Sequence, residues 1–89
     1  MKNMKAYDAY CIALSNPEFK AMCNKMKNGV ENGDSHASAF HFIVDGQRFY
    51  FGYESMYDIE ANENVIAPFY GKCSRRNGPG ANLKPIVIR

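Results

Sequence analysis

An Asp-Gly pair between two runs of alternating apolar residues constrains the fold of this chain more than any other feature. Residues 39–53 read Ala-Phe-His-Phe-Ile-Val-Asp-Gly-Gln-Arg-Phe-Tyr-Phe-Gly-Tyr. A type I′ turn needs a positive φ at both central residues, so Asp45-Gly46 predicts a tight β-hairpin. The turn also fixes the register, because Val44 then faces Gln47 and every earlier residue faces its counterpart on the second strand.

This register gives the hairpin two unlike faces. One face is aromatic and holds the pairs Phe42–Phe49, Phe40–Phe51 and Ser38–Tyr53. The other face is smaller and more polar, and holds Ile43–Arg48, His41–Tyr50 and Ala39–Gly52. We expect the aromatic face to form the core. The second face should meet water or a partner, with His41 half-exposed.

Helical spacing precedes the hairpin. Apolar residues at i, i+3, i+4 and i+7 predict a helix over about 4–15 with one buried stripe, made of Tyr7, Tyr10, Cys11 and Leu14. A second helix is expected over about 17–28, because Asn16 suits the N-cap and Pro17 the first helical position. The sequence leaves open whether Pro17 separates two helices or kinks one.

The predicted second helix carries its own apolar stripe, made of Phe19, Met22, Cys23 and Met26. The Asn28-Gly29 pair is the expected helix stop, and residues 28–37 are expected to form a polar loop.

The C-terminal half predicts two further strands, over about 65–72 and 83–89. Pro68 confines the first of these to a sheet edge or a bulge. Ser55 to Asn64 is expected to be a short helical turn or an acidic loop. With hairpin strands at about 38–44 and 47–53, the chain predicts one α+β domain: two N-terminal helices on a four-stranded, mostly antiparallel sheet.

Length and composition narrow the class of protein. A chain of 89 residues suits one small domain, and no apolar run reaches the length of a membrane span. Three cysteines without a CxxC pair do not form a disulfide framework, so we expect a cytoplasmic protein with reduced thiols and no membrane contact. Nine asparagines and five methionines suggest an AT-rich genome, such as many phages have.

Charge is segregated along the chain. Residues 1–29 carry a net +3, residues 30–64 a net −6 and residues 65–89 a net +5. Such separation creates local fields that the overall charge of +2 conceals.

The basic C-terminal segment is one candidate site. Cations on a glycine-rich backbone with a nearby tyrosine are the parts needed to bind nucleic-acid phosphates and stack on a base. The candidate residues for binding RNA or DNA are Tyr70, Lys72, Arg75, Arg76, Lys84 and Arg89. No Walker A, RNP1 or KH motif accompanies them, so a solvated loop is the alternative.

An acidic segment is the second candidate. Carboxylates interleaved with apolar residues can imitate nucleic-acid phosphates or dock into a basic groove of another protein. The segment comprises Glu54, Asp58, Glu60 and Glu63, with Tyr57 as a potential anchor and Ile59 beside it. A solubilising loop is the alternative reading.

The sequence contains no motif that indicates an enzyme. Cys11 and Cys23 lie on the predicted apolar stripes, where small buried thiols are expected. Only Cys73, near Lys72 and two arginines, has surroundings that favour a lowered pKa, so an enzyme with Cys73 as nucleophile is the remote third alternative. His36 and His41 lack metal-ligand spacing, so we expect no metal, no cofactor and no catalytic residue.

A non-enzymatic protein-binding module is therefore the leading expectation. Its size and composition resemble those of small phage or mobile-element accessory proteins, some of which inhibit a host defence machine by occluding a functional surface. The predicted partner-binding residues are His41, Arg48, Tyr50, Tyr57, Glu60, Arg75 and Arg76. The partner would be a host protein or complex in the host cytoplasm, and an exposed edge strand would also permit a homodimer. A nucleic-acid-binding module is the alternative.

Overall fold

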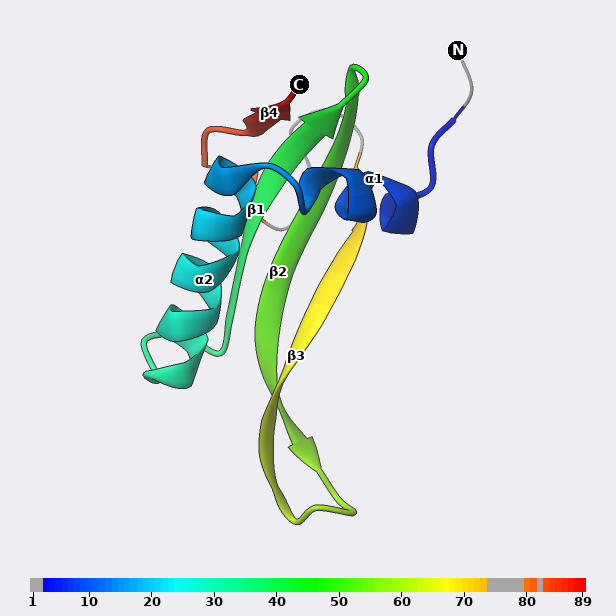
Figure 1. The fold of residues 1–89 in the computed structure, drawn as a ribbon. Coiled ribbons are helices and arrows are strands. Elements are labelled where there is room, and N and C mark those ends of the chain that lie inside the picture. Colours follow the sequence, from blue (N-terminus) through cyan, green and yellow to red (C-terminus); the bar gives the residue numbers. More distant parts are fainter. Residues whose placement is uncertain (1–2, 74–79, 82) are drawn as a thin grey trace.

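Two helices precede a four-stranded sheet in the computed structural model of the chain (Figure 1). The structure describes residues 3–73, 80–81 and 83–89. Its elements are α1 (Ala6–Ala13), α2 (Pro17–Glu31), β1 (Ala37–Val44), β2 (Gln47–Asp58), β3 (Glu63–Lys72) and β4 (Ile86–Ile88). The α+β class, the N-terminal helices and the mostly antiparallel sheet are thus confirmed, and Pro17 begins a separate helix.

The strands are ordered β3-β2-β1-β4 across the sheet. The pairs β1–β2 and β2–β3 are antiparallel, whereas β4 runs parallel to β1 through Phe42–Ile86 and Val44–Ile88. β3 is an edge strand, as Pro68 predicted. The strand expected over 83–89 is shorter than predicted, and it pairs with β1 at the far edge of the sheet from β3.

The β1–β2 hairpin has the register that its turn predicted. Val44 pairs with Gln47, and the pairing continues without a shift to Ala37 and Glu54. Asp45 and Gly46 have φ angles of 51° and 75°, both positive as a type I′ turn requires.

The core lies between the aromatic sheet face and the helices. Phe40, Phe42, Phe49 and Phe51 are all buried, and Phe19 of α2 packs edge-on against the sheet. Its ring centroid is 4.9 Å from that of Phe42. Edge-to-face contacts of this kind suit the opposite charges of a ring's face and its edge, so the aromatic face is the core face, as expected.

Helix α1 buries a different stripe from the predicted one. Ala9 and Ala13 are fully buried, while Tyr7, Cys11 and Leu14 are exposed. Two alanines let the helix backbone approach the sheet closely, and Tyr10 stacks flat on Phe51 at a centroid distance of 4.9 Å. The predicted stripe is therefore confirmed for Tyr10 alone, and the burial expected for Cys11 is wrong.

Helix α2 starts as predicted but ends one turn later. The Asn16 side chain accepts a hydrogen bond from the Phe19 amide at 3.0 Å. The predicted stop at Gly29 is wrong, because buried Val30 extends the apolar stripe. The helix ends where Gly33 (φ 81°) donates to the Val30 carbonyl and Asp34 donates to the Gly29 carbonyl, which is a Schellman motif.

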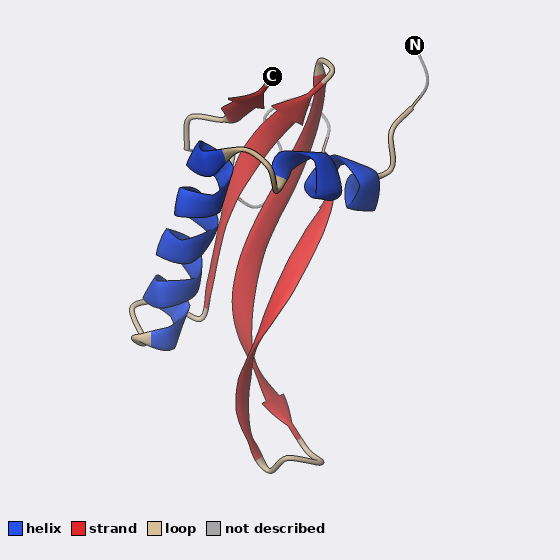
Figure 2. Ribbon diagram, viewed as in Figure 1, coloured by secondary structure: helices blue, strands red, loops and turns tan. Residues whose placement is uncertain are grey.

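Most of the segment 55–64 is strand rather than a helical turn or an acidic loop, with a turn at residues 59–62. β2 continues to Asp58 and β3 begins at Glu63, so the two strands form a long ribbon (Figure 2). The last β2 residue paired with β1 is Glu54. Residues 55–66 are here called the arm. In the arm β2 and β3 pair with each other and with no third strand that the structure describes, and the arm extends past both helices (Figure 1). Within the described residues, neither helix is long and apolar enough to cross a membrane.

Candidate functional site

The tip of the arm is held by its own side chains. Asp58 Oδ1 accepts hydrogen bonds from the Glu60 amide at 3.0 Å and the Ala61 amide at 3.4 Å. The Tyr57 hydroxyl donates to Asn62 Oδ1, and Asn62 takes the left-handed conformation with φ 57°. These bonds close the turn between β2 and β3 and favour one conformation of the tip.

Large apolar side chains are exposed on this ordered tip. Ile59 is 84% exposed, Tyr57 55% and Met56 47%. An open hollow of about 340 Å³ lies among them and is lined by Met56, Tyr57, Asp58, Ile59, Glu60 and Val65. Isolated exposed apolar residues are ordinary, but three neighbours on a projecting ribbon form a patch of the kind that binds proteins.

The ribbon places carboxylates on either side of Met56 along one of its faces. Strand alternation puts Glu54, Met56 and Asp58 on one face, opposite Ala67, Val65 and Glu63 of β3. Asp58 and Glu63 are therefore direct cross-strand partners, a pairing of like charges that destabilises a sheet. No Lys or Arg lies between Phe49 and Gly71.

The second face of the sheet contains a buried polar cluster. His41, expected to be half-exposed, is fully buried. Arg48 Nη1 lies 3.1 Å from His41 Nδ1, and Cys73 Sγ lies 3.8 Å from each ring nitrogen. Because His41 is inaccessible and Arg48 is turned toward it, the prediction that this face offers His41 to a partner is wrong.

Burial disfavours the reactive thiolate form of two cysteines, Cys73 and Cys23. Partial burial raises the pKa of Cys73, and the Arg48 charge opposes this shift with a smaller effect. The expected lowering of the Cys73 pKa is therefore contradicted. Cys23 is buried in the core, where desolvation raises its pKa to about 11.

The predicted partner-binding residues fall into separate groups. Tyr57 and Glu60 lie at the arm tip. Tyr50 is half-buried on the second sheet face, where its ring packs 6.0 Å from that of Phe69. Tyr50 and Tyr57 are seven positions apart along the extended strand, or about 23 Å. Arg75 and Arg76 lie outside the described residues.

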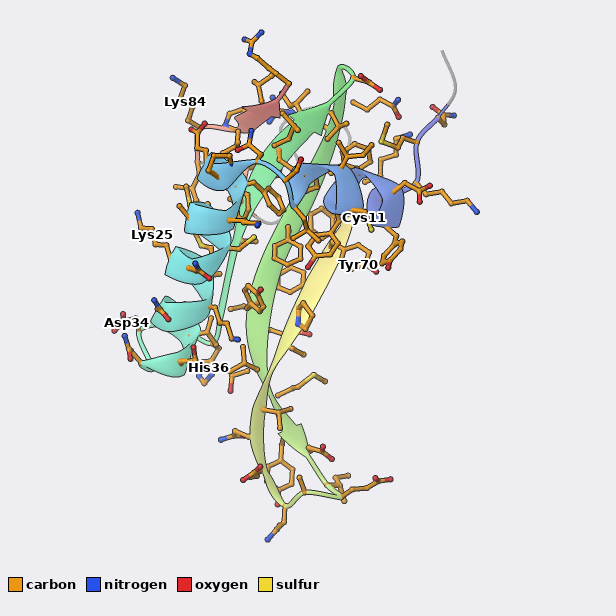
Figure 3. All side chains as sticks on the ribbon, in the orientation of Figure 1. Cys11, Lys25, Asp34, His36, Tyr70 and Lys84 are labelled. Atoms are coloured by element: carbon orange, nitrogen blue, oxygen red, sulfur yellow. The ribbon has the colours of Figure 1, made fainter. Side chains whose placement is uncertain are left out.

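The described members of the basic set are also far apart. Tyr70 and Lys72 lie on β3, whereas Lys84 and Arg89 flank β4 at the opposite edge of the sheet. Tyr70 and Lys84 accordingly lie on opposite sides of the molecule (Figure 3). Tyr70 also stacks against Tyr10 at 5.7 Å, so part of its ring is already engaged.

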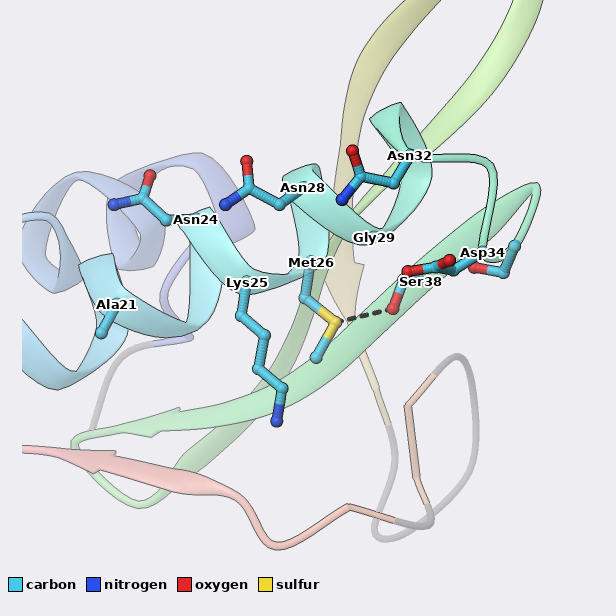
Figure 4. A pocket seen from close by; sticks show the side chains of 10 residues that line it. Ala21, Asn24, Lys25, Met26, Asn28, Gly29, Asn32, Asp34 and Ser38 are labelled. Carbon is cyan, nitrogen blue, oxygen red and sulfur yellow. Dashed lines mark hydrogen bonds between the residues drawn. The ribbon is translucent and has the colours of Figure 1, made fainter.

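A wider hollow of about 730 Å³ lies beside α2 (Figure 4). Lys25 and Met26 point from the helix toward β1, where the Ser38 hydroxyl donates to Met26 Sδ at 2.7 Å. Asn24, Asn28 and Asn32 point to the other side of the helix. The lining combines small polar side chains with single charges at Lys25 and Asp34, and no chemistry is concentrated there.

The sequence patterns did not single out two residues of the arm, Met56 and Val65. They are a cross-strand pair on the arm, between the carboxylates. The segment Glu54-Ser55-Met56-Tyr57-Asp58 continues β2 as an extended strand. Its acidic residues made the segment resemble a polar loop, so the alternation of side chains between the two faces was not recognised.

Within residues 3–73, 80–81 and 83–89, no group of three or more His, Cys, Asp or Glu side chains is placed to hold a metal ion. Comparison of the chain with protein-family models, with curated proteins and with solved structures returned no match.

Proposed function

We propose that this chain is a non-enzymatic protein-binding module and that the arm is its binding element. The observation that carries the proposal is the exposure of Met56, Tyr57 and Ile59 on a ribbon that no helix covers. Neighbouring apolar and aromatic residues on a projecting element are typical anchors of protein interfaces.

Energetics support insertion of the arm into a partner. Burying an isoleucine side chain contributes about 1.5–3 kcal/mol, and Ile59 has almost all of its surface still available. The bonds of Asp58 and Tyr57 hold the tip in place before binding, so little conformational entropy is lost on association.

The biological role in this proposal is inhibition by occlusion. A narrow ribbon fits into a groove or active-site cleft of another protein and blocks access to it. The chain would then be a phage or mobile-element accessory protein that inhibits a host defence machine. This finer role is supported by the small size and the asparagine- and methionine-rich composition.

An affinity capture with matched variants tests the proposal. The tagged chain is incubated with nuclease-treated bacterial lysate, and the retained proteins are identified by mass spectrometry. The variant Tyr57→Ser/Ile59→Ser should lose a stoichiometric partner that the wild type retains. The control Ile12→Ser/Val87→Ser alters two similarly exposed residues away from the arm and should retain it.

Equal capture by the wild type and the arm variant would contradict the proposal. Capture that depends on intact nucleic acid would instead favour the basic residues, and nucleic acid as the ligand.

A further inference from the structure

We infer that the partner of the arm is a basic protein surface, with an apolar slot rimmed by Lys or Arg side chains. The inference rests on the proposed function and specifies the chemistry of the partner. The exposed side chains of Met56, Tyr57 and Ile59 mark the part of the arm that would contact the partner. The charges around them determine which kind of partner surface would be complementary.

The charge of the arm has a single sign. Four carboxylates lie between residues 49 and 71, without a lysine or arginine among them. Asp58 and Glu63 face each other across the strands. Within the described part of the chain, none of the four carboxylates forms an ion pair. The free protein therefore bears a repulsion that a cationic partner would relieve.

Carboxylates flank the apolar pair Met56–Val65 on one face of the ribbon, whereas Tyr57 lies on the other face. On one ribbon face Met56 and Val65 lie between Glu54 at the base and the Asp58–Glu63 pair near the tip. Ile59 and Glu60 follow in the turn at the tip, and both line the hollow beside Met56 and Val65. An apolar centre with a charged rim has the anatomy of a protein interface, and its complement is an apolar slot with a cationic rim.

The charge of the arm also disfavours three other binding partners: nucleic acid, a neutral protein groove and a second copy of the chain. Nucleic acid would be repelled by the carboxylates, and a neutral groove would leave the Asp58–Glu63 repulsion in place. Among the described residues, the cations that a second copy would offer are dispersed, because Lys20 and Lys25 lie on α2, Lys72 ends β3, and Lys84 and Arg89 flank β4 at the opposite edge of the sheet.

Peptides of defined charge provide a direct test. The ¹⁵N-labelled wild-type protein is titrated with a peptide of four Arg-Leu repeats, and with Glu-Leu and Ser-Leu peptides of equal length, while amide chemical shifts are recorded. The Arg-Leu peptide should shift the amides of residues 54–65, and the other two peptides should not. Shifts spread over all exposed carboxylates, or none on the arm, would overturn the inference.

A pair of charge variants distinguishes recognition from a structural role. Asp58→Asn/Glu63→Gln should weaken binding of the Arg-Leu peptide by roughly three- to tenfold, as the loss of two surface ion pairs implies. The same variant should unfold at a higher temperature than the wild type, because the cross-strand repulsion is removed. The control Glu18→Gln/Glu31→Gln removes two carboxylates from α2 and should leave the affinity unchanged.

An equal loss of affinity in the control would contradict a specific role for the arm. If the lysate partner is lost on Tyr57→Ser/Ile59→Ser but the Arg-Leu peptide ignores the arm, the protein-binding proposal stands and the basic partner is wrong. If the arm variant loses no partner, the proposed function itself fails. Shifts of arm amides that depend on protein concentration without peptide would assign the arm to a second copy and overturn the inference.

Discussion

His41 shows how one residue connects the strands on the second sheet face. Its ring is fully buried between Arg48 of β2 and Cys73 at the end of β3. A buried imidazole needs hydrogen-bonding partners, and the Arg48 guanidinium is one of them. The cluster therefore stabilises the sheet rather than serving as a surface for recognition.

The substitution His41→Ala should lower the free energy of unfolding by about 2–4 kcal/mol, because it leaves a cavity and removes a partner of the Arg48 guanidinium. His36→Ala in the exposed loop is the matched control, and its effect should stay within about 0.5 kcal/mol. Urea denaturation measures both values. Equal stabilities of the two variants would contradict the structural role of His41.

The three thiols should react at different rates with iodoacetamide at pH 7.5. Cys11 is exposed and should be modified first. Cys73 should react more slowly than a cysteine in the urea-unfolded chain, because its raised pKa lowers the thiolate fraction. Cys23 should be protected. Mass spectrometry of digested samples gives each rate, and fast modification of Cys73 would restore it as a candidate nucleophile.

Stability should fall in alkaline solution because of Cys23. Its pKa is about 11 in the folded chain, compared with 9.0 as the reference value. Since the folded state holds this proton more tightly, its full stability is present below pH 9 and declines as the pH rises toward 11. Cys23→Ala should show a smaller decline in chemical denaturation between these pH values. An identical decline would assign the effect to other groups, such as Tyr10 and Tyr53, whose pKa values burial also raises.

At the scale of elements, α2 contains two glycines in opposite situations. Gly29 lies inside the helix, and Gly33 ends it with φ 81°. A Cβ at either position would meet no atom within 4 Å, so packing does not distinguish the two sites. The difference between them is the backbone conformation alone.

Gly29→Ala should therefore raise the free energy of unfolding by about 0.5–1 kcal/mol, because alanine favours a helix interior. Gly33→Ala should lower it by about 1 kcal/mol, because the left-handed conformation strains an alanine. Thermal unfolding followed by circular dichroism compares the pair. Changes of the same sign would show that the Schellman motif does not terminate α2.

The exposed edge of β3 is poorly suited to the edge-strand homodimer that the sequence suggested. The Cys73 amide donates to the Arg48 carbonyl on β2, so strand alternation directs the Pro68 nitrogen away from β2. Proline has no amide hydrogen, and the free edge consequently lacks a donor at its centre. Pairing of two β3 strands is thereby weakened, as in other edges protected against association.

Elements with local signals were predictable from the sequence. The Asp45-Gly46 turn fixed the β1–β2 register, and Asn16-Pro17 fixed the start of α2. The rotation of α1 was not predictable, because it depends on close packing of Ala9 and Ala13 against a sheet formed later in the chain. The arm was missed because its acidic residues concealed a strand pattern. Of the predicted partner-binding residues, Tyr57 and Glu60 lie at the candidate site, but His41 does not.

For the whole molecule, the arm makes an elongated shape of 45 × 25 × 22 Å. None of the buried core cluster, and none of the partly buried residues that pack against it, lies within residues 55–66. The body and the arm thus have different roles, since the body supplies the hydrophobic stabilisation and the arm supplies the exposed surface.

Replacing residues 55–66 with Asn-Gly should therefore leave a folded body. Glu54 and Ala67 are direct cross-strand partners, and a two-residue type I′ turn can join them. The free energy of unfolding should change by less than about 1 kcal/mol. The near-ultraviolet circular dichroism spectrum should persist while the lysate partner is lost. An unfolded product would show that the arm is part of the core.

The parallel pairing of β4 with β1 also sets an order of events during folding. β1 is made early, and its pairing with β2 needs only the adjacent turn. Phe42 and Val44, however, gain their second neighbours from Ile86 and Ile88, more than forty residues later in the chain. Closure of this long loop carries a large entropic cost, so the final step of folding should wait for the last strand and proceed more slowly than hairpin formation. Until then, a nascent chain would present one open side of β1 to the ribosome surface and to chaperones.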